Sequence, residues 1–481
     1  MMTTDTLSPV RATENGAARG LLITIALITL LVRLLVALPG GAIAQDDIAR
    51  YVMEGRTILE GRDIYVDDPA YALTVYPPPY PTLMAGLVAL GDAVGVSPAY
   101  LSKAVVALAD AGIAALVVWL LIAGGMQPRR AFTICLLLWS LNPISVLPTA
   151  VQGQIDPIHL LCTLAAAAAL MCSDALTGRV ALLAGGLIGL GIAVKVTPVI
   201  WTPIFAYMLL NGTRGQPNRS RLRLIGLFAL GCALPYLISV APLLLAGNLR
   251  AVGKTVGLIL GSGSLADVGA LPALTLLGVP MRGVNVETVD LPALGIVGDA
   301  LELLLSRGRL LLLGKLAFAG AVLGGLVWLW RRSPHPPSPS LYERSSPGRG
   351  GKKQPQNLEV PLRANGVRQG EGFRVRAFSL LTAAILLYFV IGGSLAVHYL
   401  MWALPFALIS RDRWTVVYTL GTLPVVVLFY LYRYPQMMFG AGVPVQFTHL
   451  REPFMVAAGA QWFVMAAWLA AALIRLYREN R

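Results

Sequence analysis

The sequence predicts an all-α polytopic membrane protein, and three observations support this fold class. Of the 481 residues, 56% are hydrophobic and only 13% are charged, about half the charged share of an ordinary soluble domain. The mean hydropathy is +0.70. Apolar runs long enough to cross a bilayer as a helix recur from Gly20 to the C-terminus. Spanning strands would alternate polar and apolar positions and close into a barrel, a pattern that these runs lack.

Twelve apolar segments are expected to cross the membrane. Their limits are near 20–40, 99–124, 131–149, 155–175, 179–194, 197–211, 222–246, 308–330, 377–395, 397–411, 414–432 and 454–475. The first segment is longer than the apolar part of a signal peptide and lacks a clear cleavage site, so we expect it to be retained. The stretch 81–95 is apolar but short and proline-flanked, and we expect it to lie along the outer membrane surface.

The net charge of +14 is concentrated in short loops and chain ends, as the positive-inside rule predicts for a membrane protein. Placing the basic loops in the cytoplasm divides the chain into a cytoplasmic tail (1–19), a membrane domain (20–332) with outer loops at 41–98 and 247–307, and C-terminal membrane helices (377–481). Residues 333–376, rich in Pro, Ser, Gly and basic residues, are expected to be a disordered cytoplasmic insertion. Topology accounts for the basic charge, so we expect no nucleic-acid partner.

Metal and nucleotide motifs do not stand out. The four cysteines have no CxxC spacing and lie in or beside apolar segments, as expected of small buried residues: Cys135, Cys162, Cys172 and Cys232. The sequence has no HExxH, Cys/His cluster or P-loop. An ATP-driven transporter is therefore not favoured.

The densest group of carboxylates lies in AQDDIARYVMEGRTILEGRDIYVDD, residues 44–68. Its apolar residues recur at helical spacing, which predicts a short amphipathic helix over Asp46 to Gly61 on the outer membrane surface. Asp46 or Asp47 is suited to cap the start of this helix. Two adjacent aspartates need only one cap, so the other is a candidate catalytic carboxylate.

Further polar motifs fall on the same predicted side of the membrane. In VQGQIDP, Gln152, Gln154 and Asp156 combine amides with a carboxylate, a set that suits sugar hydroxyls. Asp156 before Pro157 also fits an ordinary helix start. Lys195, in IAVKVTP, lies near a membrane boundary, where it either extends its ammonium to the interface or binds an anion.

Two more pairs of residues have both a structural and a functional interpretation. His398 and Tyr399 begin an apolar segment, where an aromatic belt is the structural alternative to a binding role. Lys103 and Asp110 are charged residues within an apolar segment; such residues are either buried in structural pairs or mark a functional site.

At these residues the chain resembles the integral-membrane GT-C glycosyltransferases. Asp47-x3-Tyr51, EGRDIY and YPPPYP are similar to the first outer loop of that family, and LNP with GQID, the lysine of KVTP and VHYLMWALPF follow in the same order. The similarity is greatest to the enzymes that add the first mannose in GPI-anchor synthesis and to bacterial polyprenol-phosphate-mannose-dependent mannosyltransferases. It covers most of residues 20–410.

The resemblance implies a GT-C-like fold and direct, inverting transfer of a sugar from a polyprenyl-phosphate donor to a glycan or glycolipid acceptor. It implies Asp47 as the base, with Asp46 second. Cations for the lipid phosphate would be Lys195, His398, Lys103 and Arg50, and the sugar or acceptor would contact Gln152, Gln154, Asp156, Tyr51 and Tyr399. The outer loop 247–307, with Arg282, Glu287 and Asp290, would cover the site.

The resemblance also bears on the metal requirement and on the cellular compartment. The GPI relative has a DxD motif where this chain has Gln45 before Asp46 and Asp47, so a divalent cation is an open alternative and no other cofactor is predicted. The family implies a bacterial plasma membrane with the site on its extracytoplasmic face. The competing interpretations are a transporter or lipid-linked sugar flippase, which would place polar residues near the bilayer midplane, and an apolar scaffold.

Overall fold

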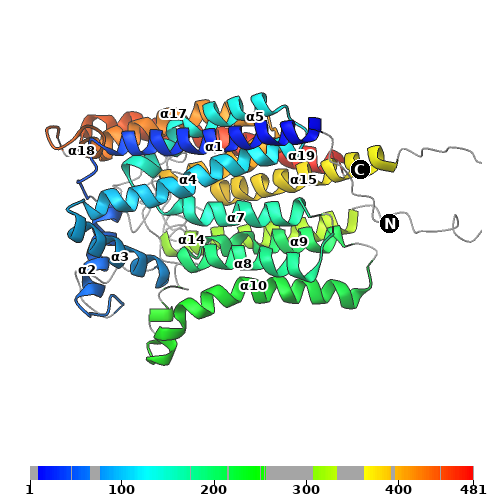
Figure 1. The fold of residues 1–481 in the computed structure, drawn as a ribbon, viewed down its shortest axis with the longest axis horizontal. Helices are drawn as coiled ribbons and strands as arrows, with labels where there is room; N and C mark the ends of the chain where they lie inside the picture. Colours follow the sequence, from blue (N-terminus) through cyan, green and yellow to red (C-terminus); the bar gives the residue numbers. More distant parts are fainter. Residues whose placement is uncertain are drawn as a thin grey trace, which may run out of the picture.

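The computed structural model describes residues 9–44, 46–65, 76–173, 175–213, 216–249, 251–253, 255, 307–332, 362–391, 396–444 and 446–479. Side chains at 9–17, 46, 307–315, 332, 362–376 and 479 lie outside this description. Within these ranges the regular elements are all helices, and the long ones run along one common axis (Figure 1). The all-α prediction is therefore confirmed for the described residues.

Five helices are long and apolar enough to cross a membrane: α1 (Pro9–Ala37, apolar from Ala18), α4 (Pro98–Ala123), α10 (Asn218–Leu245), α17 (Trp414–Arg433) and α19 (Arg451–Glu479). On α1, Ile23, Leu27, Leu31 and Leu35 are each 54–62% exposed and recur every fourth residue. Residues four apart share one helix face, so α1 presents a continuous stripe of large apolar side chains outward. Such a surface suits lipid rather than water.

A sixth candidate span is broken. It consists of α5 (Pro128–Cys135) with the π-helical turn η1 (Leu136–Ser140), then α6 (Pro143–Val146) with a second π-helical turn, η2 (Leu147–Val151), and the two halves meet at 56°. Pro143 and Pro148 lack the backbone N–H that a continuous helix needs. The Asn142 side chain accepts a hydrogen bond from the Ile144 N–H (3.1 Å) and so caps the second half.

The remaining predicted spans are also helical, but most are shorter. They comprise α7 (Asp156–Met171), α8 (Gly178–Val194), η3 (Thr197–Trp201) with α9 (Thr202–Gly212), α14 (Arg307–Arg332), α15 (Leu362–Ile391) and η4 (Val397–Trp402) with α16 (Ala403–Ser410). Each of the twelve predicted segments thus contains helix. Length and composition identify five of them, or six with the broken pair, as spans.

One predicted boundary differs. Helix α15 begins at Leu362, inside the segment 333–376 for which composition predicts disorder. Residues 362–376 extend the apolar part of α15 as one helix, whereas 333–361 lie outside the described residues, where disorder stays a prediction. Most of the outer loop 247–307, including Arg282, Glu287 and Asp290, also lies outside them.

Close helix packing depends on small residues where α8 meets α10. A Cβ atom at Gly185 would lie 2.2 Å from the Phe228 carbonyl oxygen, and one at Gly231 would lie 2.6 Å from the Leu182 oxygen. Small residues that let backbones approach are typical of membrane helix pairs. None of the four cysteines forms a disulfide, as expected of residues in apolar helices.

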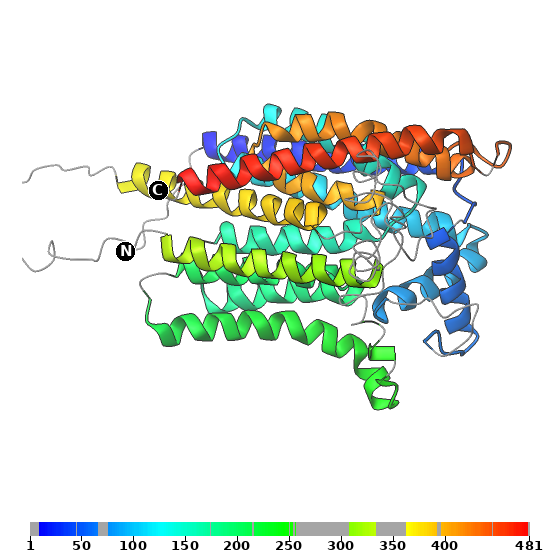
Figure 2. The ribbon, with the colours of Figure 1, turned by 180° about the vertical axis from the view of Figure 1, so that it is seen from behind.

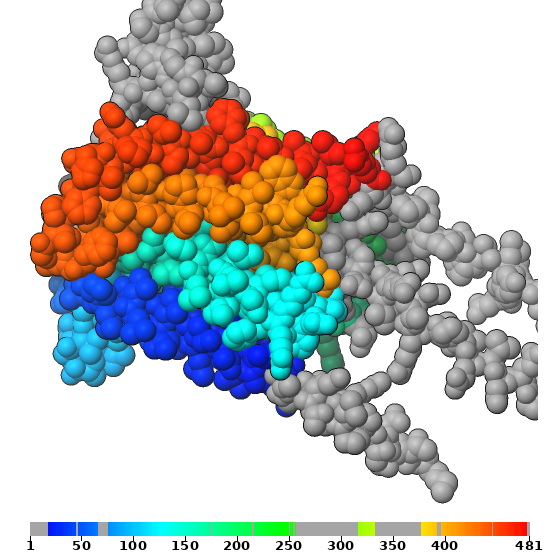
Figure 3. Space-filling view, turned by 90° about the horizontal axis from the view of Figure 1, so that it is seen from above, coloured from blue at the N-terminus to red at the C-terminus, as the bar shows by residue number. Residues whose placement is uncertain are grey.

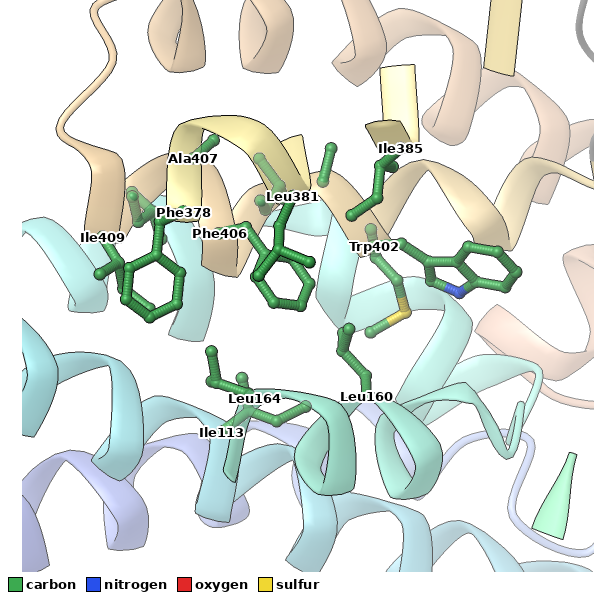
Figure 4. Packing of buried hydrophobic residues seen from close by; sticks show 14 of the residues in the cluster. Ile113, Leu160, Leu164, Phe378, Leu381, Ile385, Trp402, Phe406, Ala407 and Ile409 are labelled. Atoms are coloured by element: carbon green, nitrogen blue, oxygen red, sulfur yellow. The ribbon is translucent and has the colours of Figure 1, made fainter. Parts of the chain in front are cut away.

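The main core joins the two halves of the chain. Ile113 of α4 and Leu164 of α7 face Phe378 and Leu381 of α15 and Phe406 of α16 (Figure 4). Trp402 belongs to the same packed layer at the edge of this view. The C-terminal helices are therefore held on the N-terminal ones by apolar contacts, with Trp402 at the boundary between core and polar residues.

A buried ion pair fixes the broken span against α1 and α4. Arg33 Nε lies 2.5 Å from Asp110 Oδ2, and both side chains are fully buried. The same guanidinium donates to the Ser140 carbonyl oxygen and to Ser145 Oγ (2.9 Å). Asp110 therefore pairs with Arg33 of α1 rather than with Lys103.

The two ends of the bundle differ in composition. Helix α2 (Asp46–Leu59), α3 (Pro79–Val94) and α18 (Pro435–Phe439) lie at one end, and both chain termini extend from the other (Figures 1 and 2). The helix ends on the terminus side carry most of the described arginines: Arg19, Arg129, Arg130, Arg179, Arg219, Arg221, Arg223, Arg331, Arg411, Arg413, Arg475 and Arg478. This separation matches the predicted division into basic and polar sides. Helix α3, which contains most of 81–95, packs on α2 and is not among the candidate spans.

Candidate functional site

Helix α2 forms the outer wall of the candidate site. It begins at Asp46, as predicted, and ends at Leu59, two residues before the expected Gly61. Ile48 and Tyr51 are fully buried against α3 and α4. Burying this face turns the start of the helix, with Asp47, toward the 152–156 turn. The Asp46 side chain lies outside the described residues.

Asp47 has a partly exposed carboxylate, and both of its oxygens accept hydrogen bonds. Its Oδ1 accepts from Arg50 Nη2 (2.9 Å), and its Oδ2 accepts from Gln154 Nε2 (2.5 Å). The Asp47 side chain is 28% exposed, so it is oriented by the protein and still accessible. We call Asp47, Arg50, Tyr76 and Gln154 the Asp47 cluster.

Arg50 connects this carboxylate to an aromatic group. Its Nη2 also donates to Tyr76 Oη (3.3 Å), and its guanidinium lies 5.3 Å and 5.2 Å from the ring centres of Tyr51 and Tyr76. Burial lowers the pKa of Arg50, but Tyr76, Tyr51, Asp47 and Glu54 raise it, and the net direction is upward. Arg50 is therefore a permanent cation beside Asp47.

Tyr51 is a packing residue in this structure. Its ring makes edge contacts with Tyr76 and Tyr80, at 5.5 Å and 4.9 Å between centres, and its hydroxyl lies 3.1 Å from that of Tyr76. Burial raises the pKa of Tyr51 well above its ordinary value, so the hydroxyl stays protonated. The side chain has no exposed area, which argues against the predicted contact of Tyr51 with a sugar.

A second carboxylate, Asp156, lies at the start of α7 and is completely buried. Lys195 Nζ lies 3.1 Å from both carboxylate oxygens, His159 Nε2 lies 3.1 Å from Oδ1, and Trp402 Nε1 donates to Oδ1 at 2.9 Å. His398 Nε2 is 3.7 Å from Oδ2. We call these five residues the Asp156 cluster.

The predicted helix start at Asp156 is confirmed, but its carboxylate does not cap α7. Both oxygens are instead occupied by nitrogen groups of the Asp156 cluster. A carboxylate so enclosed has little capacity for a sugar hydroxyl. Its main effect is to hold Lys195. The Lys195 side chain is 3% exposed, and the negative charge of Asp156 compensates its positive charge.

The two clusters lie within electrostatic range of each other. Asp47 interacts with His398, and Tyr76 interacts with both Lys195 and Tyr399. The Lys195 ammonium lies 4.9 Å from the centre of the Tyr399 ring, which in turn packs on Trp402 at 4.2 Å. The structure therefore brings together Asp47, Arg50, Gln154, Asp156, Lys195, His398 and Tyr399 from the predicted set.

Gln152 and Lys103 lie beside the clusters with other partners. Gln152 Oε1 accepts from Tyr430 Oη (2.6 Å), and its Nε2 donates to Tyr434 Oη (3.3 Å), so its amide links the 152–156 turn to α17. Lys103 Nζ donates to the Gly40 carbonyl oxygen (3.0 Å) and is 1% exposed. Neither geometry supports the predicted direct contact with sugar or phosphate.

The turn between these residues depends on Gly153. Its φ angle is +64°, and a Cβ atom there would lie 2.5 Å from Ile48 Cδ1 and 3.0 Å from Lys103 Cγ. A side chain would therefore be strained in backbone conformation and would collide with α2. Gly153 lets α2 approach the turn closely enough for Asp47 to reach Gln154.

Three members of the clusters were absent from the predicted set: Tyr76, His159 and Trp402. His159 follows Asp156 by three residues, a spacing that places both on one helix face and could have identified it. Trp402 lies on the η4 segment that also carries His398. Tyr76 begins the YPPPYP motif, but its contact with Arg50 joins positions 26 residues apart and has no local signal.

The described groups that donate to Asp47 are N–H groups, and the Asp46 side chain lies outside the description, so a divalent cation stays an open alternative. Both oxygens of Asp47 face N–H groups, and one of these belongs to a cation, Arg50. Hard divalent cations require several oxygen ligands. Among the described residues, no group of three His, Cys, Asp or Glu side chains has metal-site geometry.

Comparison with known proteins gives no further assignment. No protein-family model matches the chain, and no curated protein matches it.

Proposed function

We propose that the protein is an integral-membrane glycosyltransferase of the GT-C type. It would move a sugar, which the motif resemblance suggests is mannose, from a polyprenyl-phosphate donor to an acceptor hydroxyl. The single observation that carries the proposal is the partly exposed carboxylate of Asp47. Gln154 and Arg50 orient it, and it lies at the same end of the bundle as the buried Lys195 cation.

Asp47 is the base in this mechanism. A carboxylate within hydrogen-bond reach can take the acceptor proton as the hydroxyl oxygen attacks the anomeric carbon. The new C–O bond forms as the bond between that carbon and the phosphate oxygen breaks, and the electron pair leaves with the polyprenyl phosphate. Attack opposite to the leaving group inverts the anomeric configuration.

Cations already in place would stabilise the phosphate as it leaves. Groups fixed before the reaction lower the barrier most because they need not reorganise. Arg50 is held by Asp47 and Tyr76, and Lys195 is held by Asp156. His398, 3.7 Å from Asp156, would offer a ring N–H to the phosphate as a hydrogen-bond donor, and Tyr399 would present an aromatic face to the sugar.

The membrane arrangement supports the same proposal. With the arginine-rich end in the cytoplasm, α2, α3 and both clusters lie on the outer side. In this proposal the shorter helices complete a bundle of twelve crossings, the polyprenyl chain lies beside the helices, and its phosphate lies near α2. The motif resemblance favours a bacterial plasma membrane.

A lipid-linked sugar flippase is the second candidate, because Arg33 and Asp110 form an ion pair between two candidate spans. Charged residues inside membrane segments often mark a transport path. This pair is fully enclosed and hydrogen-bonded to Ser140 and Ser145, which favours a structural role. A flippase would move the lipid without forming a covalent product.

The decisive experiment uses membranes containing the full chain and labelled polyprenyl-phosphate mannose. Wild-type protein should yield a product whose mass is increased by one hexose. Asp47→Asn should lower transfer by about 10²–10⁴-fold, the usual contribution of a general base. Asp92→Asn is the matched control, because Asp92 is 51% exposed at the same end and pairs only with Arg56 among the described residues.

Each alternative result has a distinct meaning. If Asp46→Asn abolishes transfer and Asp47→Asn does not, the base is the neighbouring residue. If both variants remain active, the site assignment is wrong. Movement of the labelled lipid without a covalent product would support the flippase.

A further inference from the structure

A second polar site lies at the opposite end of the bundle, between the start of α17 and the end of α19. A cavity of about 470 Å³ opens there, lined by Arg413, Trp414, Ala471, Ile474, Arg475 and Arg478. Three of the six lining residues are arginines and the other three are apolar. No residue of the Asp47 or Asp156 cluster takes part.

The charges around this cavity are unbalanced. The nearby carboxylate, Asp412, is 7% exposed and is directed inward, where it accepts from Trp468 Nε1 (3.0 Å) and the Trp414 N–H (3.0 Å). It also pairs with Arg475 (3.2 Å). No ion pair joins Arg413 or Arg478 to a carboxylate in the described part of the chain. Counting the described side chains, the cavity therefore holds an excess of positive charge and favours an anion.

The apolar half of the cavity continues along the helix surfaces. Ile474 is 52% exposed, and Leu473, Val416, Val417 and Leu420 on the adjoining turns are 45–65% exposed. Helices α17 and α19 lie side by side on an open face of the bundle (Figure 3). An anion with one or two long apolar chains would match both parts, whereas free phosphate would match only the arginines.

We propose that this cavity binds the headgroup of an anionic phospholipid from the membrane leaflet at the arginine-rich end. The guanidinium groups of Arg413 and Arg478 hold the phosphate, and the acyl chains lie on the exposed apolar surfaces of α17 and α19. Arginine suits this task because its planar group can donate two parallel hydrogen bonds to phosphate. Basic pockets between membrane helices on the cytoplasmic side are suited to such headgroups.

The test is a lipid titration of the purified full-length protein in detergent, read by native mass spectrometry with phosphatidylglycerol and, separately, phosphatidylcholine. Wild-type protein should bind one phosphatidylglycerol about tenfold or more tightly than phosphatidylcholine. The Arg413→Gln/Arg478→Gln variant should lose most of that difference. Arg179→Gln/Arg219→Gln is the matched control, because it removes two exposed arginines from the same end outside the cavity.

Three results would overturn the proposal: unchanged phosphatidylglycerol binding by Arg413→Gln/Arg478→Gln, an equal loss in the control variant, or full displacement of the lipid by soluble glycerol phosphate at the same concentration. If the double variant aggregates, the two single variants replace it. Each should weaken phosphatidylglycerol binding about threefold.

Discussion

The Asp47 and Asp156 clusters place two carboxylates of the same kind in opposite situations. Asp156 is fully buried and in contact with Lys195, His159, His398 and Trp402. Asp47 is 28% exposed, and among the described residues two side chains hold it, those of Arg50 and Gln154. A carboxylate surrounded by donors is committed to holding its neighbours, whereas an oriented and accessible one can still take a proton. Under the proposed function, the difference favours a structural role for Asp156 and a catalytic role for Asp47.

The largest effect on stability should follow Asp156→Asn. The variant leaves the buried Lys195 ammonium without its counter-charge, and removing one partner of a buried ion pair costs about 3–5 kcal/mol. We expect the Tm in detergent to fall by roughly 3–5 °C. Asp47→Asn, at a partly exposed position, should shift it by less than about 2 °C.

A second variant sharpens this result. Asp156→Asn/Lys195→Met removes both charges and should recover part of the lost Tm, because no isolated charge remains buried. Equal Tm values for Asp47→Asn and Asp156→Asn would contradict the proposal that Asp156 is structural and Asp47 is catalytic.

A smaller effect, on turnover rather than stability, should follow Gln154→Leu. The substitution removes the amide that donates to Asp47 Oδ2, and a hydrogen bond to a charged group contributes about 1.5–3 kcal/mol. We expect kcat to fall about 10–100-fold with little change in KM, since the residue orients the base. A raised KM at unchanged kcat, measured in the labelled-mannose assay, would instead assign Gln154 to substrate binding.

The smallest effect should follow Tyr430→Phe. This change removes the hydroxyl that donates to Gln152 and should cost about 1 kcal/mol of stability. Transfer activity should stay near the wild-type rate, because Gln152 contacts α17 rather than the Asp47 cluster. A loss of activity as large as that of Gln154→Leu would show that the anchor to α17 also sets the geometry of the base.

The sequence was sufficient for the elements of the fold. Helical spacing predicted an amphipathic helix that starts at Asp46, and apolar length predicted a helix in each of twelve segments. These properties are local, since they depend on residues within a few turns of each other. The resemblance-based roles of Asp47, Lys195 and His398 stay predictions, but the structure does bring these residues to one end of the bundle.

Partner choice could not be predicted in the same way. Lys195 meets Asp156 across 39 residues, and Gln152 meets Tyr430 across 278. Such pairs depend on how helices pack, and no spacing in the sequence encodes that. The ion pair of Arg33 is an exception. A lone arginine in an apolar span requires a buried partner, so the sequence alone predicts that Arg33 has one.

Gly153 has a consequence for the geometry of the Asp47 cluster. Asp47 directly precedes Ile48 in the chain, and Gln154 directly follows Gly153. Ile48 and Gly153 are also the residues at which α2 comes close to the turn. Any added carbon at position 153 would therefore push donor and acceptor apart together, without altering either functional group. The distance between α2 and the rest of the bundle thus depends on the absence of a side chain at position 153. A substitution at this one position would change the rate of the proposed transfer while every polar residue stays the same.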